Sequence, residues 1–309
     1  MTRREVVKSA IAHKDVGIVP YCVDFCSEEH QNKAKAHFPN GDFGNFIYGI
    51  GCPWWDWFDV PASYLGFDAP DFLPQTRGTG SYEAFKEQLE FAKKNTDSYI
   101  LVYIYGSHFE KAYFARGIEN FLADLAGDKE YAKSLLDMII RKNMVMIENI
   151  LTYPEIDGIL LGSDWGSQQS LLMSPEVWRE LIAPGELKEY ELIKQSGKDV
   201  WIHSCGNIEQ VIPDLIDMGV DVINPVQPEA MDIYNLKSKY GSKITFFGGI
   251  STQQTLPYGT PDEVRAETEK VVSFMRKGGG YIASPSQCLQ EDVPIENIVA
   301  LFEKLKSFT

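Results

Sequence analysis

Short apolar runs separated by longer amphipathic stretches recur along the whole chain. The runs are rich in β-branched and aromatic residues, a composition typical of strands. Seven of them are predicted to be strands, at residues 16–23, 99–105, 158–161, 200–203, 220–224, 244–247 and 281–283, with an eighth at 46–50. Several are apolar on both faces, which is typical of parallel strands in a sheet covered by helices.

The stretches between the runs carry helix signals. Residues 129–150 place apolar side chains on one face at a 3.6-residue spacing. Ser174 before Pro175 predicts a helix start, and Thr260 with Glu263 forms a capping-box pattern. From about residue 155 onward, strand and helix alternate. This order predicts an α/β fold, and we favour a (β/α)₈ TIM barrel; fewer than eight strands would leave an open doubly wound sheet.

Length and charge limit the classes of protein. The 309 residues show no internal repeat, low-complexity tract or linker, so a single domain over residues 1–309 is expected. With 29 Lys and Arg against 44 Asp and Glu, the formal net charge is −15, which argues against nucleic acid and against an anionic membrane surface as partners. No run reaches the roughly 20 apolar residues of a membrane helix and no signal peptide is visible, so a cytoplasmic protein is expected.

Polar and reactive residues follow five of the predicted strands. In a (β/α)₈ barrel, the loops at the carboxyl ends of the strands build the active site. We therefore expect these residues to meet at one mouth. They are Cys22, Asp24 and Cys26 after the first run, then His108 and Glu110, Asp164 and Gln168, His203, Cys205 and Asn207, and finally Cys288.

His203 and Cys205 are one residue apart at the end of a predicted strand, and Cys288 follows a later one. Imidazole and thiolate are ligands that zinc prefers, and three protein ligands with one open position is the usual catalytic arrangement. The sequence thus suggests a zinc site made by these three residues. The fourth position would belong to water, substrate or a carboxylate, with Asp164 and Glu110 as candidates. The alternative is a hydrogen-bonded strand-end histidine beside a structural thiol.

The remaining cysteines and a tryptophan-rich segment suggest two further features. An odd number of cysteines, five, favours free thiols, metal ligands or catalytic residues over a disulfide framework. Cys22, Cys26 and Cys52 could form a rival metal site, but we expect buried free thiols. The segment 51–58 contains Trp54, Trp55 and Trp57 and is either a plug for the barrel or an aromatic wall for an apolar ligand.

Several motifs together resemble the uroporphyrinogen decarboxylase superfamily, and within it the cobalamin-dependent methyltransferase branch. They lie at residues 164–168, 173–176, 203–207, 224–227, 248–251 and 293–297. The resemblance implies a (β/α)₈ barrel and zinc held by His203, Cys205 and Cys288. True decarboxylases of the superfamily carry a basic Arg- and Gly-containing motif near the N-terminus, whereas residues 24–30 here are acidic.

The function that this resemblance implies is zinc-dependent methyl transfer between a small substrate and the cobalt of a corrinoid (cobalamin) protein. We favour an aromatic methyl ether as methyl donor, that is, an O-demethylase. Asp164 and Glu110 are the expected catalytic residues. The expected substrate-binding residues are Trp54, Trp55, Trp57, Gln168 and Asn207. The alternatives are methylcobalamin:thiol methyl transfer, decarboxylation, and a non-catalytic barrel that binds a corrinoid or an aromatic ligand.

Overall fold

The computed structural model describes residues 1–38, 41–53, 79 and 81–309. Within these residues seven strands form one sheet in chain order. They are β1 (Ile47–Gly51), β2 (Tyr99–Ile104), β3 (Gly158–Gly162), β4 (Asp199–His203), β5 (Val222–Val226), β6 (Thr245–Ile250) and β7 (Tyr281–Pro285). The pairs β2–β3, β3–β4, β5–β6 and β6–β7 are parallel. The predicted α/β fold, with parallel strands and intervening helices, is confirmed, and seven of the strands of the favoured (β/α)₈ arrangement lie among the described residues.

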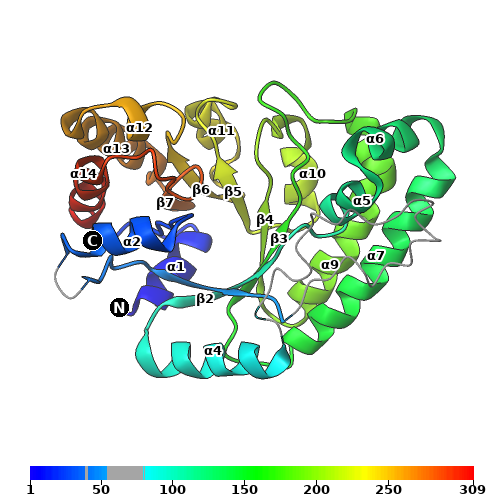
Figure 1. The fold of residues 1–309 in the computed structure, drawn as a ribbon, viewed down its shortest axis with the longest axis horizontal. Helices are drawn as coiled ribbons and strands as arrows, with labels where there is room; N and C mark the ends of the chain where they lie inside the picture. Colours follow the sequence, from blue (N-terminus) through cyan, green and yellow to red (C-terminus); the bar gives the residue numbers. More distant parts are fainter. Residues whose placement is uncertain (39–40, 54–78, 80) are drawn as a thin grey trace. The chain divides into compact units, whose positions relative to one another are not determined.

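Helices alternate with the strands along the chain (Figure 1). They are α1 (Arg3–Ile11), α2 (Glu28–Lys35), α4 (Tyr82–Asn95), α5 (Phe109–Arg116), α6 (Ile118–Gly127), α7 (Lys129–Ile150), α8 (Pro175–Val177), the π-helical turn η2 (Trp178–Ile182), α9 (Ala183–Gln195), the 3₁₀ turn η3 (Glu209–Val211), α10 (Ile212–Asp217), α11 (Ile233–Tyr240), α12 (Thr255–Tyr258), α13 (Pro261–Met275) and α14 (Ile295–Lys306). None of these helices is both long enough and apolar enough to cross a membrane.

Three helix predictions are confirmed. The helix α7 spans the predicted residues 129–150. The Ser174 side chain caps α8 by accepting from the Val177 N–H, and Thr260 and Glu263 form a reciprocal capping box at the start of α13. At the starts of α8 and α13 a side-chain oxygen thus accepts from an N–H group that has no partner within the helix.

The chain divides into two compact units. The first unit comprises residues 1–48, 97–99 and 222–309, and the second comprises residues 49–96 and 100–221. The first unit holds β5, β6 and β7, and the second holds β3, β4 and most of β2. The expected single domain over the whole chain stays a prediction.

In the first unit, the run predicted as a strand at 16–23 forms only an isolated parallel bridge, between Tyr21 and Ala283. The Cys22 N–H donates to the Ala283 carbonyl at 3.1 Å, and the Ala283 N–H donates to the Pro20 carbonyl at 2.9 Å. On the other side the Phe46 N–H donates to the Tyr21 carbonyl at 2.9 Å. The run therefore lies between β7 and the residue that precedes β1. Pro20 has no N–H to donate, which explains why the ladder is short.

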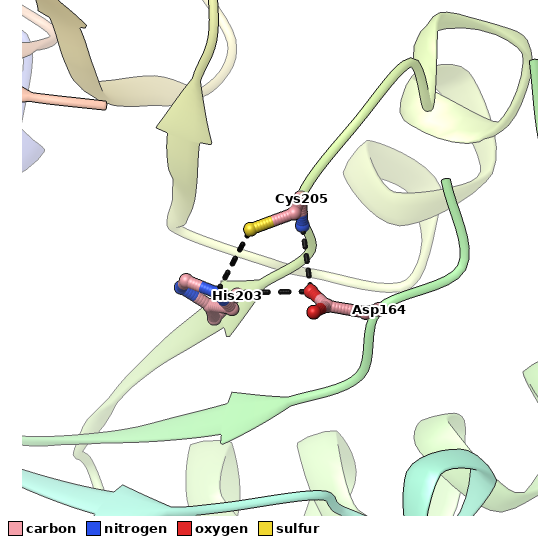
Figure 2. Close-up of side chains that lie close together, drawn as sticks. All are labelled: Asp164, His203 and Cys205. Carbon is pink, nitrogen blue, oxygen red and sulfur yellow. Dashed lines mark hydrogen bonds and ion pairs between the residues drawn. The ribbon is translucent and has the colours of Figure 1, made fainter. Parts of the chain in front are cut away.

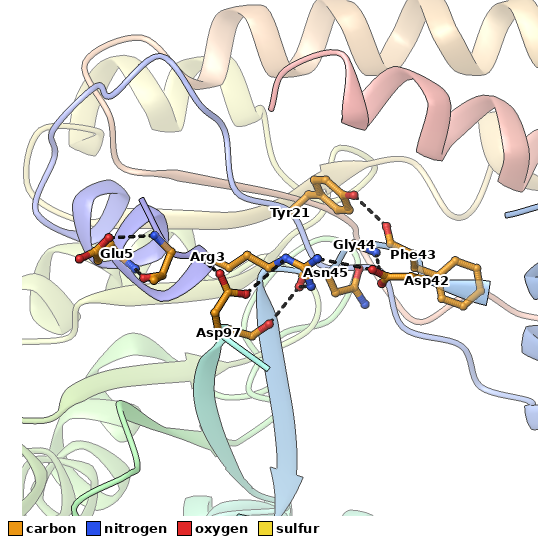
Figure 3. Close-up of polar contacts among 10 residues, drawn as sticks. Arg3, Glu5, Tyr21, Asp42, Phe43, Gly44, Asn45 and Asp97 are labelled. Atoms are coloured by element: carbon orange, nitrogen blue, oxygen red, sulfur yellow. Dashed lines mark hydrogen bonds and ion pairs between the residues drawn. The ribbon is translucent and has the colours of Figure 1, made fainter. Parts of the chain in front are cut away.

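Arg3 connects the N-terminal helix to the turn before β1 (Figure 3). Its guanidinium donates to the Asn45 carbonyl at 3.4 Å and lies 3.5 Å from an Asp42 carboxylate oxygen and 3.7 Å from one of Asp97. The Phe43 carbonyl of the same turn accepts a hydrogen bond of 2.8 Å from the Tyr21 hydroxyl. A Cβ at Gly44 would lie 2.6 Å from that hydroxyl, so the turn requires glycine.

The second unit positions the loops that leave β3 and β4. Strands β3 and β4 pair in register so that Gly162 lies opposite His203 at their carboxyl ends. All five residues of β3 are buried, which fits a strand covered on both faces. The loops that leave β3 and β4 therefore start side by side.

Candidate functional site

Backbone hydrogen bonds join the loop after β3 to the end of β4 and the loop that follows. The Ser163 N–H donates to the His203 carbonyl at 2.8 Å, and the Asn207 N–H donates to the Ser167 carbonyl at 2.7 Å. Between them, the Trp165 N–H donates to a serine hydroxyl of the β4 loop at 3.0 Å. These bonds hold the two loops as one rigid layer.

Two glycines allow this close approach. A Cβ at Gly166 would lie 2.5 Å from the Cys205 carbonyl oxygen, and a Cβ at Gly206 would lie 2.4 Å from the Ser167 carbonyl oxygen. Gly206 also has a φ of +80°, a conformation that residues with a side chain rarely adopt. Both positions require glycine because backbone atoms occupy the space of any side chain.

Asp164 and Cys205 from these loops and His203 from the end of β4 point toward one another (Figure 2). The Cys205 Sγ lies 3.5 Å from the His203 Nε2, and the His203 Nε2 lies 3.7 Å from the Asp164 Oδ1. One donor atom from each residue lies within 4.8 Å of the other two. The Asp164 Oδ1 also accepts a hydrogen bond of 2.7 Å from the Cys205 N–H, which fixes the carboxylate beside the thiol.

This donor set fits a zinc ion in both chemistry and spacing. Zinc–ligand distances of about 2.0–2.3 Å in tetrahedral geometry place a nitrogen and a sulfur ligand about 3.5 Å apart, and a nitrogen and an oxygen ligand about 3.3–3.4 Å apart. The 3.5 Å between the Cys205 Sγ and the His203 Nε2 matches this geometry, and the 3.7 Å between the His203 Nε2 and the Asp164 Oδ1 is a few tenths of an ångström longer. The side chains of His203 and Asp164 are 26% and 35% exposed, so a small substrate can reach them. The sequence suggested two carboxylates, Asp164 and Glu110, as candidates for the position beside His203 and Cys205. In the structure Asp164 lies there.

The other candidate residues of the second unit have different environments. Glu110 lies in the first turn of α5 and accepts a hydrogen bond of 3.0 Å from the Tyr113 hydroxyl. Asn207 is half-buried, and its side-chain oxygen accepts from the Glu209 N–H at 3.1 Å. Gln168 is exposed. None of the three belongs to either of the two donor sets found among the described residues, which are Asp164 with His203 and Cys205, and His108 with Glu186 and Glu189.

Trp54, Trp55 and Trp57, the candidate aromatic wall, lie outside the described residues. Their assignment to substrate binding stays a prediction.

The first unit contains Cys288, whose sulfur is bonded to that of Cys26 in a disulfide. The expectation that Cys26 is a buried free thiol is therefore wrong, because its side chain is exposed and its partner follows β7 on a neighbouring segment. Cys22 and Cys52 are buried free thiols, as expected. Burial raises the pKa of both, so they are poor nucleophiles and poor metal ligands.

A second group of ionisable side chains lies entirely inside the second unit. His108, Glu186 and Glu189 have no exposed surface. The His108 Nδ1 lies 3.1 Å from the Glu186 Oε1, and the His108 Nε2 lies 3.1 Å from the Ile182 carbonyl, to which it can only donate. The contact between His108 and Glu186 therefore needs a second proton, held by the ring or by the carboxyl.

Polar neighbours complete this buried cluster. Glu189 accepts from the Ser107 hydroxyl at 2.9 Å and from the Asn143 amide at 2.8 Å. Lys111 donates to the Asn143 side-chain oxygen at 2.7 Å. Glu186 accepts from the Ser163 hydroxyl at 3.2 Å. Because Ser163 immediately precedes Asp164, the cluster supports the loop that carries the donor set.

Burial and charge shift the pKa values in the cluster. Burial lowers the pKa of His108, but Glu186 and then Glu189 raise it by more, so the net pKa is raised. Burial, followed by repulsion from Glu186, raises the pKa of Glu189 to about 7. Burial lowers the pKa of Lys111 to about 8. Each shift has desolvation of the charged form among its causes.

The carbonyl that accepts from His108 belongs to Ile182, the last residue of the π-helical turn η2. In this turn the Ala183 N–H donates to the Trp178 carbonyl, five residues back. The next residue, Pro184, has no N–H, so the regular pattern of helix hydrogen bonds is interrupted here. His108 lies in the turn just before α5, and its partner Glu186 was not identified from the sequence.

Comparison with known proteins identifies the family. The model of the family Uroporphyrinogen decarboxylase (URO-D) matches residues 80–308. The chain therefore belongs to the uroporphyrinogen decarboxylase family, as the sequence motifs suggested. Among solved structures, a methyltransferase from Methanosarcina mazei has a TM-score of 0.72 and 16% identity, covering 100% of this chain and 99% of that chain. At this identity the likeness shows a shared fold.

Two other solved structures are much less similar to this chain. D-psicose 3-epimerase in the presence of D-fructose has a TM-score of 0.36 and 12% identity, covering 91% of this chain and 90% of that chain. A D-tagatose 3-epimerase-like protein has a TM-score of 0.33 and 12% identity, covering 86% and 88%. No curated protein matches the chain in sequence.

Proposed function

We propose that the protein is a zinc-dependent methyltransferase that moves a methyl group from a small substrate, an aromatic methyl ether, to the cobalt of a corrinoid protein. The observation that carries the proposal is the convergence of one nitrogen, one sulfur and one oxygen donor from His203, Cys205 and Asp164. Membership of the uroporphyrinogen decarboxylase family and the fold shared with the methyltransferase from Methanosarcina mazei support it.

In this proposal His203, Cys205 and Cys288 hold the zinc, and Cys288 takes part as a thiolate once its disulfide is reduced. Zinc bound there would supply Lewis acidity toward the oxygen from which the methyl group departs. The Asp164 carboxylate keeps Cys205 in place through its 2.7 Å hydrogen bond from the Cys205 N–H and is the nearest further oxygen donor.

The substrate would lie over this donor set. The proposed contacts come from Gln168 and Asn207, from Glu110, and from the indole rings of the tryptophan-rich segment 54–57. Methyl transfer leaves a negative charge on a phenolate oxygen, so a site of low polarity with one cationic centre suits this leaving group. The acidic chain provides few other cations for that purpose.

Metal analysis followed by a methyl-transfer assay tests the proposal. Protein purified under reducing conditions is expected to contain one zinc per chain, and Cys205→Ser is expected to lose it. Cys52→Ala, which removes a buried free thiol, is the matched control and should retain zinc. With cob(I)alamin, a phenyl methyl ether should produce the methylcobalamin spectrum, whereas methanol and methylamines should not.

Two results would contradict the proposal. Zinc-free protein with full transfer activity would remove the metal from the mechanism. Zinc-loaded protein that demethylates no ether but consumes methylcobalamin in the presence of a thiol would reverse the direction of transfer.

A further inference from the structure

Two segments of the first unit, residues 24–26 and 288–289, run side by side in parallel register. Phe25 and Leu289 form a parallel bridge, the Cys26 N–H donates to the Leu289 carbonyl at 3.0 Å, and the Leu289 N–H donates to the Asp24 carbonyl at 2.8 Å. This register brings Cys26 beside Cys288, with their Cα atoms 5.4 Å apart and their sulfurs joined. Backbone pairing, rather than chance side-chain contact, therefore keeps the two sulfurs together.

This pair differs from the other cysteines in its access to solvent. Cys26 is exposed and Cys288 is half-buried, whereas Cys22 and Cys52 are buried free thiols. The Gln290 side-chain amide donates to the Cys26 Sγ at 2.9 Å. Exchange between thiols and disulfides requires access to the sulfur atoms, and this pair has it.

We infer that Cys26 and Cys288 are a reversible redox pair that controls zinc binding at the proposed site. Oxidation joins the sulfur of Cys288 to that of Cys26 and removes it as a metal ligand; reduction returns it. The inference rests on the proposed function, in which Cys288 is a zinc ligand. In this scheme Cys26 is not a zinc ligand itself. Its role is to determine whether Cys288 is available to bind the metal.

The chemistry balances with a two-electron oxidant of the diazene class, such as diamide. The Cys288 thiolate and the Cys26 thiol lose two electrons and one proton as the S–S bond forms, and the N=N bond takes up these electrons and two protons, the second from water, to become a hydrazine. A dithiol such as dithiothreitol reverses the change by supplying two electrons and two protons and becoming a cyclic disulfide. A sulfur engaged in a disulfide has no thiolate charge to offer a metal.

The experiment compares wild type, Cys26→Ser and Cys22→Ser, each reduced, loaded with zinc and freed of excess metal. Diamide is then added, zinc release is measured with a chromogenic chelator, and disulfides are located by peptide mass mapping. Wild type should form the Cys26–Cys288 link and lose zinc affinity by roughly 10-fold or more. Cys26→Ser should keep its zinc, because Cys288 has no partner. Cys22→Ser, the matched control four residues earlier, should behave as wild type.

Two results would overturn the inference alone: zinc retained in wild type after the link has formed, or zinc released equally by Cys26→Ser. A Cys288→Ser variant separates this from failure of the proposed function. If reduced Cys288→Ser binds zinc as tightly as wild type, the proposed ligand set is wrong. If reduced Cys288→Ser has lost its zinc, the proposed ligand set stands. In that case, zinc retained by oxidised wild type or released equally by Cys26→Ser would exclude only the redox role of Cys26.

Discussion

Replacing Glu189 by glutamine should remove a large pH dependence from the stability of the second unit. The buried Glu189 carboxyl has its pKa raised from 4.5 to about 7, so it keeps its proton in the folded chain at pH values where the unfolded chain has released it. The free energy of unfolding therefore falls as the pH rises from about 4.5 to about 7, by about 3 kcal/mol for this carboxyl. Glutamine fits the same space, since Asn143 can still donate to its oxygen and the Ser107 hydroxyl can turn to accept from its NH₂.

Urea unfolding followed by tryptophan fluorescence measures this effect. Trp165, Trp178 and Trp201 are fully buried in the second unit, so their emission reports on the part of the chain that contains Glu189. Near pH 4.5 the two proteins should have similar free energies of unfolding. At pH 7 and slightly above, Glu189→Gln should be the more stable by about 3 kcal/mol.

A control on the same helix isolates the effect of burial. Glu191→Gln changes an exposed carboxylate two residues further along α9 and should follow the wild-type pH dependence. The reasoning is refuted if the stability difference between wild type and Glu189→Gln is constant from pH 4.5 to 7. A constant difference would mean that the Glu189 carboxyl has the same pKa in the folded and unfolded chains.

Three further predictions concern other parts of the chain. Gly185→Ala should lower the free energy of unfolding by about 1–3 kcal/mol in urea titrations, because the new Cβ would lie 2.8 Å from the His108 Nε2; an unchanged midpoint would contradict this contact. Asp164→Ala should weaken zinc binding by roughly 10- to 100-fold in competition with a chelator, since the Cys205 N–H loses its acceptor; equal affinity would exclude Asp164 from the site. Tyr281→Phe should destabilise the chain by about 1 kcal/mol in urea, because a buried 2.9 Å hydrogen bond to a β6 carbonyl is lost, and a stability equal to wild type would show that this bond contributes nothing.

Most of the barrel could be predicted because its strands are apolar on both faces and its helices carry clear caps. The runs at 158–161 and 200–203 became β3 and β4 with only small changes at their ends. The run at 16–23 looked like a strand by composition, yet its pairing with β7 is limited to Pro20, Tyr21 and Cys22 around a single bridge. Hydrophobicity predicts that a segment is buried, whereas its hydrogen bonding depends on the residues beside it in space.

The candidate site was predicted in part for a similar reason. Asp164, His203 and Cys205 follow adjacent strands, and parallel pairing alone brings such residues together. The buried carboxylates were missed because acidic residues on a helix usually face solvent. One signal was present: Glu186 and Glu189 fall on the face of α9 that also carries the buried Ile193.

The π-helical turn has a consequence for how this part of the chain can vary. Each residue of an α-helix advances the side-chain direction by about 100°. Deleting one residue from 178–182 would restore ordinary α-helical spacing and rotate Glu186 and Glu189 by about that angle, away from His108. The extra residue thus sets the rotational phase of α9, so related chains that keep the buried carboxylates should also keep the length of this turn.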